Sequence, residues 1–225
     1  MTKFIALDST QMGTQCAAAL LGSTETAKLV NMAPATVQKD VYATVAKALT
    51  KKLKSMKKAE APELKEYFLK YPEAFLSREV AKPATMTLGY GATASKFAEQ
   101  FQEKLLKETG EALPMKAARK LGAMMYETLR EVLPASIALM ESLTGIVKKV
   151  VAVTGQPFTF TTATGSKFTA AKYKEIEFKN LGEGFGNAMG LPYTTKTLAP
   201  GATARSAAAQ YIQSYDAAIA GTIQN

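Results

Sequence analysis

Two cations and one tyrosine recur at near-helical spacing between residues 78 and 91, in the stretch REVAKPATMTLGYG. On an α-helix each step of four residues advances only about 40° around the axis, so such residues form one slowly turning stripe, here about 18 Å long. Its members are Arg78, Lys82, Met86 and Tyr90, and Gly91 leaves room beside the last of them.

The residue types along this stripe predict a ligand with an anionic end and a ring. Arg78 offers a planar fork to a phosphate oxygen, Lys82 adds a compact charge one turn later, and Tyr90 offers a flat face to a base or a sugar. The alternative is an ordinary amphipathic helix with two solvated cations and a partly buried tyrosine.

Pro83 lies in the middle of the stripe. It has no backbone N–H to donate, and it disfavours α geometry at the preceding Lys82. Two arrangements remain: the helix begins here, with Pro83 in its first turn, or a longer helix is kinked at Pro83. A helix that begins here would also direct its free N–H groups toward phosphate.

The composition restricts the chemistry available to the chain. Its 225 residues include 28 Lys and Arg against 19 Asp and Glu, and the net charge of +9 favours a polyanionic partner such as nucleic acid or a phosphate compound. There is no histidine and Cys16 is the only cysteine, which excludes an intrachain disulfide, an ordinary zinc site and catalysis by histidine. Catalysis would rest on carboxylates, Lys, Arg, Tyr or a hard metal ion.

Neither a membrane span nor a targeting segment is evident in the sequence. No apolar run approaches the roughly 20 residues that cross a bilayer. The first residues, MTKFIALDST, resemble neither a signal peptide nor a transit peptide. We therefore expect an intracellular, reducing setting and no membrane partner.

A strand and two helices are expected in the first 58 residues. The strand covers residues 1–8 and ends at Asp8, one of only three aspartates in the chain. A helical segment follows through Leu21, and Pro34 is expected to open a longer helix. The buried face of that helix is predicted to carry Val37, Val41, Val45 and Leu49. Its basic end, KKLKSMKK, is interpreted as a solvated terminus that complements the helix dipole rather than as a DNA contact.

Proline and glycine divide the remaining sequence into further elements. Segments 62–71 and 94–110 are amphipathic helices, and the apolar helical stretch 115–150 is interrupted by Pro134. From residue 150 to about 180, Val, Thr and Phe with glycine punctuation predict antiparallel strands. The stretch from Gly190 is interpreted as a loop followed by an alanine-rich helix. The expected fold class is α+β, mostly α.

Two motifs in combination resemble those of a known family. DSTQMGTQ places Asp8, Gly13 and Gln15 in the pattern D-x4-G-x-Q, in which a strand ends in a metal-binding aspartate. The pattern R-x3-K-x3-M-T-x2-Y-G is matched between Arg78 and Gly91. The chain therefore resembles the catalytic core of the single-subunit RNA polymerases of phages and mitochondria, in the DNA polymerase A superfamily.

Weaker matches follow in the same order over essentially the whole chain. They are TVQKDVYATVAKAL, with Tyr42 at the family's tyrosine, PMKAARKLGAMMYETL, FTTATG and AAQYIQSYDAAI. The resemblance implies part of a right-hand polymerase. Residues 1–36 would be a partial palm with the first metal-binding motif, residues 37–213 the fingers, and residues 214–225 the start of the return to the palm.

The resemblance implies two-metal nucleotidyl transfer with two Mg²⁺ ions. Asp8 would bind both ions, with the Ser9 carbonyl as an additional ligand. Arg78 and Lys82 would hold the triphosphate of an incoming NTP, and Lys82 would also protonate the leaving pyrophosphate. Tyr90 would stand at the ribose and the nascent base pair, with Gln15 and Tyr42 in supporting positions.

Two positions favour ribonucleotides over deoxyribonucleotides. DNA polymerases of the superfamily have a glutamate that blocks the 2′-hydroxyl at the position of Gly13, and an aromatic residue at the position of Met86. At a third position the family has a histidine that senses the ribose, and this chain has Gln213, whose amide can still form a hydrogen bond. Gln213 is accordingly included in the predicted NTP site.

The family's second metal-binding aspartate belongs to a His-Asp-Ser type motif that this sequence lacks. Asp216 is aligned with the H-S-x-D stretch in preference to that catalytic motif. A lone carboxylate is a poor two-metal site. We therefore expect one subunit of a split phage-type RNA polymerase, inactive until partner chains supply the second aspartate and the N-terminal domain.

The remaining expected partners are template DNA, the RNA product and NTPs. A phage-encoded chain would lie in the host cytoplasm, or be associated with the virion. The alternatives are a catalytically inactive polymerase-like subunit for DNA binding or assembly, a fragment of a family A DNA polymerase, and a basic helical protein with chance motifs. Retention of Asp8, Arg78, Lys82 and Tyr90 argues against an inactive subunit, and the kept order of the weaker matches argues against chance.

Overall fold

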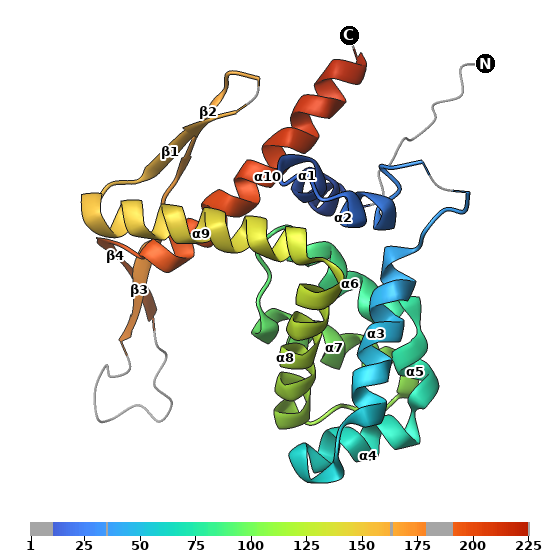
Figure 1. The fold of residues 1–225 in the computed structure, drawn as a ribbon. Coiled ribbons are helices and arrows are strands. Elements are labelled where there is room, and N and C mark those ends of the chain that lie inside the picture. The colour runs from blue at the N-terminus through green and yellow to red at the C-terminus, as the bar shows by residue number, and fades with distance from the viewer. Residues whose placement is uncertain (1–10, 35, 163, 179–190, 225) are drawn as a thin grey trace, which may run out of the picture. The chain divides into compact units, whose positions relative to one another are not determined.

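The computed structural model describes residues 11–34, 36–162, 164–178 and 191–224, which belong to two compact units, residues 1–140 and 141–225 (Figure 1). The strand expected over residues 1–8, with Asp8, lies outside the described residues, as does Ser9. Among the described helices, none is both long and apolar enough to cross a membrane.

The first unit is helical. Its elements are α1 (Met12–Leu20), α2 (Thr24–Leu29), α3 (Val41–Ser55), the 3-10 turn η1 (Lys58–Glu60), α4 (Pro62–Lys70), α5 (Pro72–Leu76), α6 (Arg78–Leu88), α7 (Ala94–Thr109) and α8 (Met115–Val132). Helices α3 to α8 bury one continuous hydrophobic core, in which Leu49, Phe97 and Leu121 are almost fully enclosed. Burial of these apolar side chains is the main force that holds the helices together.

The contact between α7 and α8 requires a glycine. A Cβ atom on Gly122 would lie 2.2 Å from the carbonyl oxygen of Ala94 and 2.9 Å from the backbone nitrogen of Ala98. Both atoms belong to the backbone, so they cannot move aside cheaply. The absence of a side chain at Gly122 therefore sets how closely the two helices approach.

Helix α3 begins later than the sequence predicts. Its first residue is Val41, and Asp40 caps it by accepting the backbone N–H groups of Tyr42 and Ala43. Before the cap, the Asn31 side chain bonds both the N–H and the carbonyl of Lys39, which holds a loop. The prediction of a helix opened by Pro34 is therefore wrong, and Val37 is 68% exposed rather than buried. The buried positions Val41, Val45 and Leu49 are confirmed.

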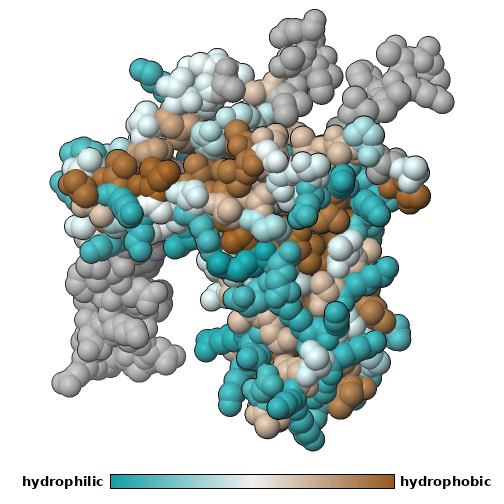
Figure 2. Space-filling view, viewed as in Figure 1, coloured by the Kyte–Doolittle hydropathy of each residue, from teal (hydrophilic) through white to brown (hydrophobic). Residues whose placement is uncertain are grey.

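The predicted helix boundaries farther along are confirmed. Gly110 ends α7 in the left-handed conformation, with φ of 73°. Pro134 separates α8 from α9 (Pro134–Thr154), which continues into the second unit. Hydrophobic residues form a continuous band along α9 in Figure 2, where Ile146, Val150 and Val153 are exposed.

The second unit contains two antiparallel strand pairs and a long helix. β1 (Phe158–Thr161) pairs with β2 (Lys167–Ala170), β3 (Tyr173–Phe178) pairs with β4 (Leu191–Leu198), and α10 (Pro200–Gln224) follows. Its small core joins Val147 and Val151 of α9 to Ala170 of β2 and to Ala204 and Ala207 of α10. Aromatic side chains extend this packing, because Phe160 lies against both Phe168 and Tyr211.

The β element begins within the predicted range but extends beyond it. The sequence interpretation of residues 190–200 as a loop is wrong, since Leu191–Leu198 forms β4. This segment, LPYTTKTL, is rich in threonine, which suits a strand. It becomes a strand by pairing with β3, from Tyr173 opposite Leu198 to Phe178 opposite Leu191. The mostly helical α+β class is confirmed.

Replacement of Gly122 by alanine should destabilise the first unit. Alanine favours a helix by about 1 kcal/mol over glycine, but the clash with the α7 backbone should cost about 1–3 kcal/mol more than that gain. Gly145→Ala is the matched control, because a Cβ at Gly145 of α9 meets nothing within 4 Å. Urea unfolding followed by circular dichroism should show a lower midpoint for Gly122→Ala only. Equal midpoints for the two variants would contradict the close contact.

Candidate functional site

Helix α6 presents the predicted stripe to solvent. Ser77 caps the helix by accepting the N–H of Glu79 at 3.2 Å. The buried face consists of Val80, Ala81, Ala84, Thr85 and Leu88. Arg78, Lys82 and Met86 lie on the other side, and Met86 is 45% exposed. The helix thus buries one face in the core and exposes Arg78 and Met86, with Lys82 half-buried, on the opposite face.

Pro83 lies inside α6, as its sixth residue. The alternative in which Pro83 stands in the first turn is therefore wrong, because the Ser77 cap starts the helix at Arg78. Pro83 cannot donate to the Glu79 carbonyl, so one helical hydrogen bond is missing. One turn later, the Thr87 hydroxyl donates to the Pro83 carbonyl at 2.9 Å and accepts from Gln100 of α7 at 3.3 Å. These bonds fasten the segment after the proline to its neighbour.

The end of α6 fixes the position of Tyr90. The N–H of Ala92 bonds the Thr87 carbonyl at 3.1 Å, and the N–H of Gly91 bonds the Leu88 carbonyl at 3.1 Å. Gly91 has φ of 78°, so this is the Schellman arrangement that ends many helices with a glycine. Gly91 therefore has a conformational role. The prediction that Tyr90 lies on the helix is wrong: α6 ends at Leu88, and Tyr90, 38% exposed, lies in the turn that follows.

The two sequence motifs meet at a contact between glycines. A Cβ atom on Gly89 would lie 3.0 Å from the Cα of Gly13, so the backbones of α1 and the α6 terminus touch. In α1, the Gln15 amide donates to the Val30 carbonyl at 3.0 Å, which fastens α1 to the end of α2. The structure therefore brings Gly13 next to the tyrosine end of the stripe, 76 positions away in the sequence.

Arg78 is held at the other end of the stripe by three groups. Its Nε donates to Oδ2 of Asp40 at 2.9 Å, and an Nη donates to Glu79 at 2.9 Å. Its guanidinium also lies 4.7 Å from the centre of the buried Tyr42 ring. Such a cation–π contact, like each exposed ion pair, contributes about 1 kcal/mol or less. Together they restrict the guanidinium to one orientation.

Lys82 differs from Arg78 in its surroundings. It lies one turn farther along α6, is partly exposed, and forms no ion pair with any described residue. The second terminal nitrogen of Arg78 also donates to no described carboxylate. The stripe thus offers to an anion the Lys82 ammonium group and one terminal nitrogen of the Arg78 guanidinium, whose other two nitrogens donate to carboxylates.

Asp40 contacts the stripe, and the sequence interpretation did not include it. One carboxylate oxygen caps α3 and the other holds Arg78. Burial alone would raise its pKa, but hydrogen bonds from Ala43 and Arg78 and the charge of Arg78 outweigh burial, so the pKa lies below the usual 3.8. An aspartate directly before a helical run was the available signal, since it is a preferred N-cap.

Two further predicted residues belong to the second unit, and two lie outside the described residues. Gln213 and Asp216 are exposed on α10, in the second unit. Within the described ranges, no group of three or more Asp, Glu, Cys or His side chains is placed to hold a metal ion. The roles assigned to Asp8 and Ser9 stay predictions.

The Asp40–Arg78 pair should make stability depend on pH. Because the folded pKa of Asp40 is lowered, the pair stabilises the fold above pH 3.8 and loses this effect as pH falls through the folded pKa. Asparagine caps helices about as well as aspartate, so Asp40→Asn should lower the unfolding free energy at pH 7 by about 0.5 kcal/mol and by nothing near pH 2. Asp40→Ala should lose about 1 kcal/mol more through the cap. Urea titrations between pH 2 and 7 measure both.

An Arg78→Gln background provides the control for that experiment. In this background, Asp40→Asn should lower the unfolding free energy at pH 7 by less than it does in the wild type. The reason is that Asp40 keeps only its hydrogen bonds to backbone N–H groups once the guanidinium is gone. If Asp40→Asn lowers the unfolding free energy of the wild type equally at pH 2 and pH 7, the ion pair with Arg78 is not the cause of the loss.

Comparison with known proteins identifies the family to which the chain belongs. No curated protein matched the chain. A family model described as DNA-dependent RNA polymerase matches residues 2–178, which include both sequence motifs and all of α6. With more than half of its length matched, the chain belongs to the DNA-dependent RNA polymerase family of the phage and mitochondrial type.

Proposed function

We propose that this chain supplies the NTP-binding helix and one metal-binding carboxylate of a phage-type RNA polymerase. Membership of the family supports transcription and nucleotidyl transfer as the reaction. The observation that carries the residue assignment is the stripe on α6. It begins at a restrained Arg78, continues through Lys82, and ends at Tyr90 beside Gly13.

The triphosphate is assigned to the cationic end of the stripe. Phosphate oxygens accept hydrogen bonds from the second terminal nitrogen of Arg78 and from the Lys82 ammonium, which carries three donors. Because Asp40, Glu79 and Tyr42 already orient the guanidinium, binding costs little additional side-chain entropy. Lys82 also donates a proton to the leaving pyrophosphate and regains it from solvent.

The sugar is assigned to the other end. Tyr90 lies at the turn fixed by Gly91, and the small Gly13 stands against that turn. A glycine leaves space for a ribose 2′-hydroxyl where a larger side chain would exclude it. Met86, one turn before Tyr90, offers an exposed flexible side chain in place of a second aromatic ring.

Two Mg²⁺ ions are the cofactor implied by this function. The donors assigned to them, the Asp8 carboxylate and the Ser9 carbonyl, are the hard oxygen ligands that Mg²⁺ prefers, so their chemistry fits. When bound, the ions would supply Lewis-acid activation of the attacking 3′-hydroxyl and charge neutralisation at the leaving pyrophosphate.

The second carboxylate comes from outside these 225 residues. The His-Asp-Ser type motif that provides it in the family requires a histidine, and the sequence contains none. A partner chain or a further segment of the same protein supplies it. Template DNA and NTPs are the other partners of the active assembly.

Replacement of Asp8 by asparagine should abolish RNA synthesis. The amide keeps the size of the side chain but removes the charge that binds the metal ions, so incorporation should fall by at least 10³-fold, on the order of the loss of a central catalytic group. The measurement is Mg²⁺-dependent NTP incorporation on a primed template, with the chain assembled with the protein that carries the second aspartate. Asp216→Asn is the matched control and should keep its rate. Undiminished incorporation by Asp8→Asn would refute the metal assignment.

Replacement of Tyr90 by phenylalanine should relax the choice of sugar. The ring and its packing remain, but the hydroxyl that meets the ribose is lost, so the ratio of rNTP to dNTP incorporation should fall by about tenfold, the effect of one hydrogen bond. Tyr71→Phe is the control, because its hydroxyl bonds Glu111 at 2.8 Å, away from α6. Competition between labelled rNTP and dNTP measures the ratio, and an unaltered ratio would remove Tyr90 from this role.

A further inference from the structure

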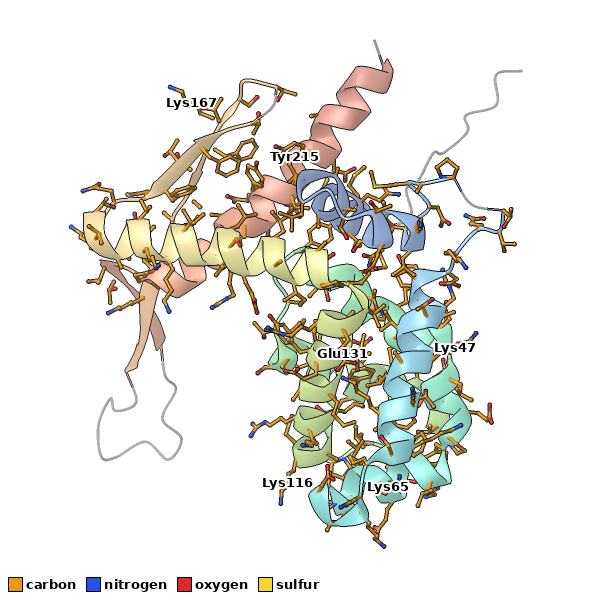
Figure 3. The ribbon with its side chains drawn as sticks, in the orientation of Figure 1. Lys47, Lys65, Lys116, Glu131, Lys167 and Tyr215 are labelled. Carbon is orange, nitrogen blue, oxygen red and sulfur yellow. The ribbon has the colours of Figure 1, made fainter. Side chains whose placement is uncertain are left out.

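Three lysines form a row on the outer face of α3. Lys47, Lys51 and Lys54 follow one another at steps of four and three residues, so they lie within about 60° of one another around the helix. All three are exposed, whereas Val45, Leu49 and Leu53 are buried in the core. Figure 3 labels Lys47 along this helix. We call Lys47, Lys51 and Lys54 the α3 lysine row.

Three neighbouring lysines have other partners, whereas the exposed Lys57 forms no ion pair with a described residue. Lys52 pairs with Glu131 of α8 at 2.8 Å, and Lys58 pairs with Glu66 of α4 at 2.8 Å. Lys65 of α4 donates to the carbonyls of Leu53 and Lys54, both at 2.9 Å, and so satisfies the C-terminal end of α3 (Figure 3). Lys65 thus complements the C-terminal end of α3 together with Lys52 and Lys54 of its last turn, whereas Lys47 and Lys51 lie before that turn.

The row also differs from three other exposed lysines of the first unit, although Lys57, Lys116 and Lys120 are likewise exposed and form no ion pair with a described residue. Lys70 pairs with Glu111, Lys96 with Glu99, and Lys107 with Glu103. No member of the α3 lysine row forms an ion pair with a described residue. Three adjacent ammonium groups on a rigid helix, without carboxylates to neutralise them, create a local positive potential that attracts a polyanion.

We propose that the α3 lysine row binds the phosphate backbone of duplex DNA. From Lys47 to Lys54 the helix rises about 10.5 Å, which is comparable to the axial length of about three phosphates of one strand. Lysine is a flexible point charge and reads no base, so the contact is independent of sequence. The family acts on a DNA template, which favours DNA over an acidic protein. This binding needs neither Asp8 nor the α6 stripe.

The test is the salt dependence of DNA binding by the full chain. Binding of a labelled 20-base-pair duplex of arbitrary sequence is followed by fluorescence anisotropy at several salt concentrations. In the variant Lys47→Gln, Lys51→Gln, Lys54→Gln, the slope of log K against log [salt] should fall by about 2.7, since each lost phosphate contact removes about 0.9. The Kd near 0.1 M salt should rise at least tenfold. Glutamine is a good helix former, so α3 should persist.

The matched control is the variant Lys70→Gln, Lys96→Gln, Lys107→Gln, which removes the same three charges from lysines that are already paired. It should change the slope by less than 1. An equal effect in both variants would show that binding follows net charge alone, and wild-type binding by the row variant would show no contact at the row; either result overturns the proposal. Polyglutamate binding would also overturn the proposal if the peptide bound the wild type as tightly as DNA does and bound the row variant more weakly.

Circular dichroism of both triple variants checks that the helices are intact. If the triple variant unfolds, the single variant Lys51→Gln replaces it in the binding assay. Its slope of log K against log [salt] should fall by about 0.9, and an unchanged slope would overturn the proposal. Because the assay contains no NTP, its outcome is separate from that of the polymerase measurements. Loss of catalysis in Asp8→Asn with no effect at the row would support the proposed function and reject this one.

Discussion

The site depends on one carboxylate that serves two helices. Asp40 caps α3 with one oxygen and holds Arg78, the first residue of α6, with the other. The cap decides where α3 begins, and the ion pair decides how the guanidinium is turned. Tyr42, in the first turn of α3, contacts the same guanidinium with its ring. These contacts restrict an otherwise flexible arginine to one orientation and leave one terminal nitrogen without a described carboxylate partner.

Close backbone contacts provide the remaining precision. Gly122 lets α8 approach α7, and Gly89 lets the end of α6 approach Gly13 of α1. Helix α6 is thus held at its start by an ion pair, along its length by a buried apolar face, and at its end by backbone contact. A helix fixed in this way keeps its exposed residues in register with a bound ligand, which lowers the entropic cost of binding.

Local patterns predicted most of the elements but not their exact limits. The apolar periodicity and the positions of proline and glycine predicted α4, α7, α8 and the break at Pro134. These signals are local, because a helical period and a proline affect the backbone conformation of only a few neighbouring residues. Val37 continued the periodicity of α3 but stands outside the helix, since the Asp40 cap and the Asn31–Lys39 bonds end the pattern there. β4 was missed because a strand of mixed polarity is decided by its partner, and β3 lies more than ten residues away.

The sequence by itself determined the identity and order of Arg78, Lys82 and Tyr90, the common helical face of Arg78 and Lys82, and the absence of histidine. Those features depend only on residue type and on the 3.6-residue period. The tertiary structure decided which charges are free. In the folded chain Arg78 pairs with Asp40, Lys52 and Lys58 pair with glutamates, and Gly13 lies beside Gly89. These contacts join residues that are separated in the sequence. Spacing cannot report a contact of that kind, since it arises only when helices pack.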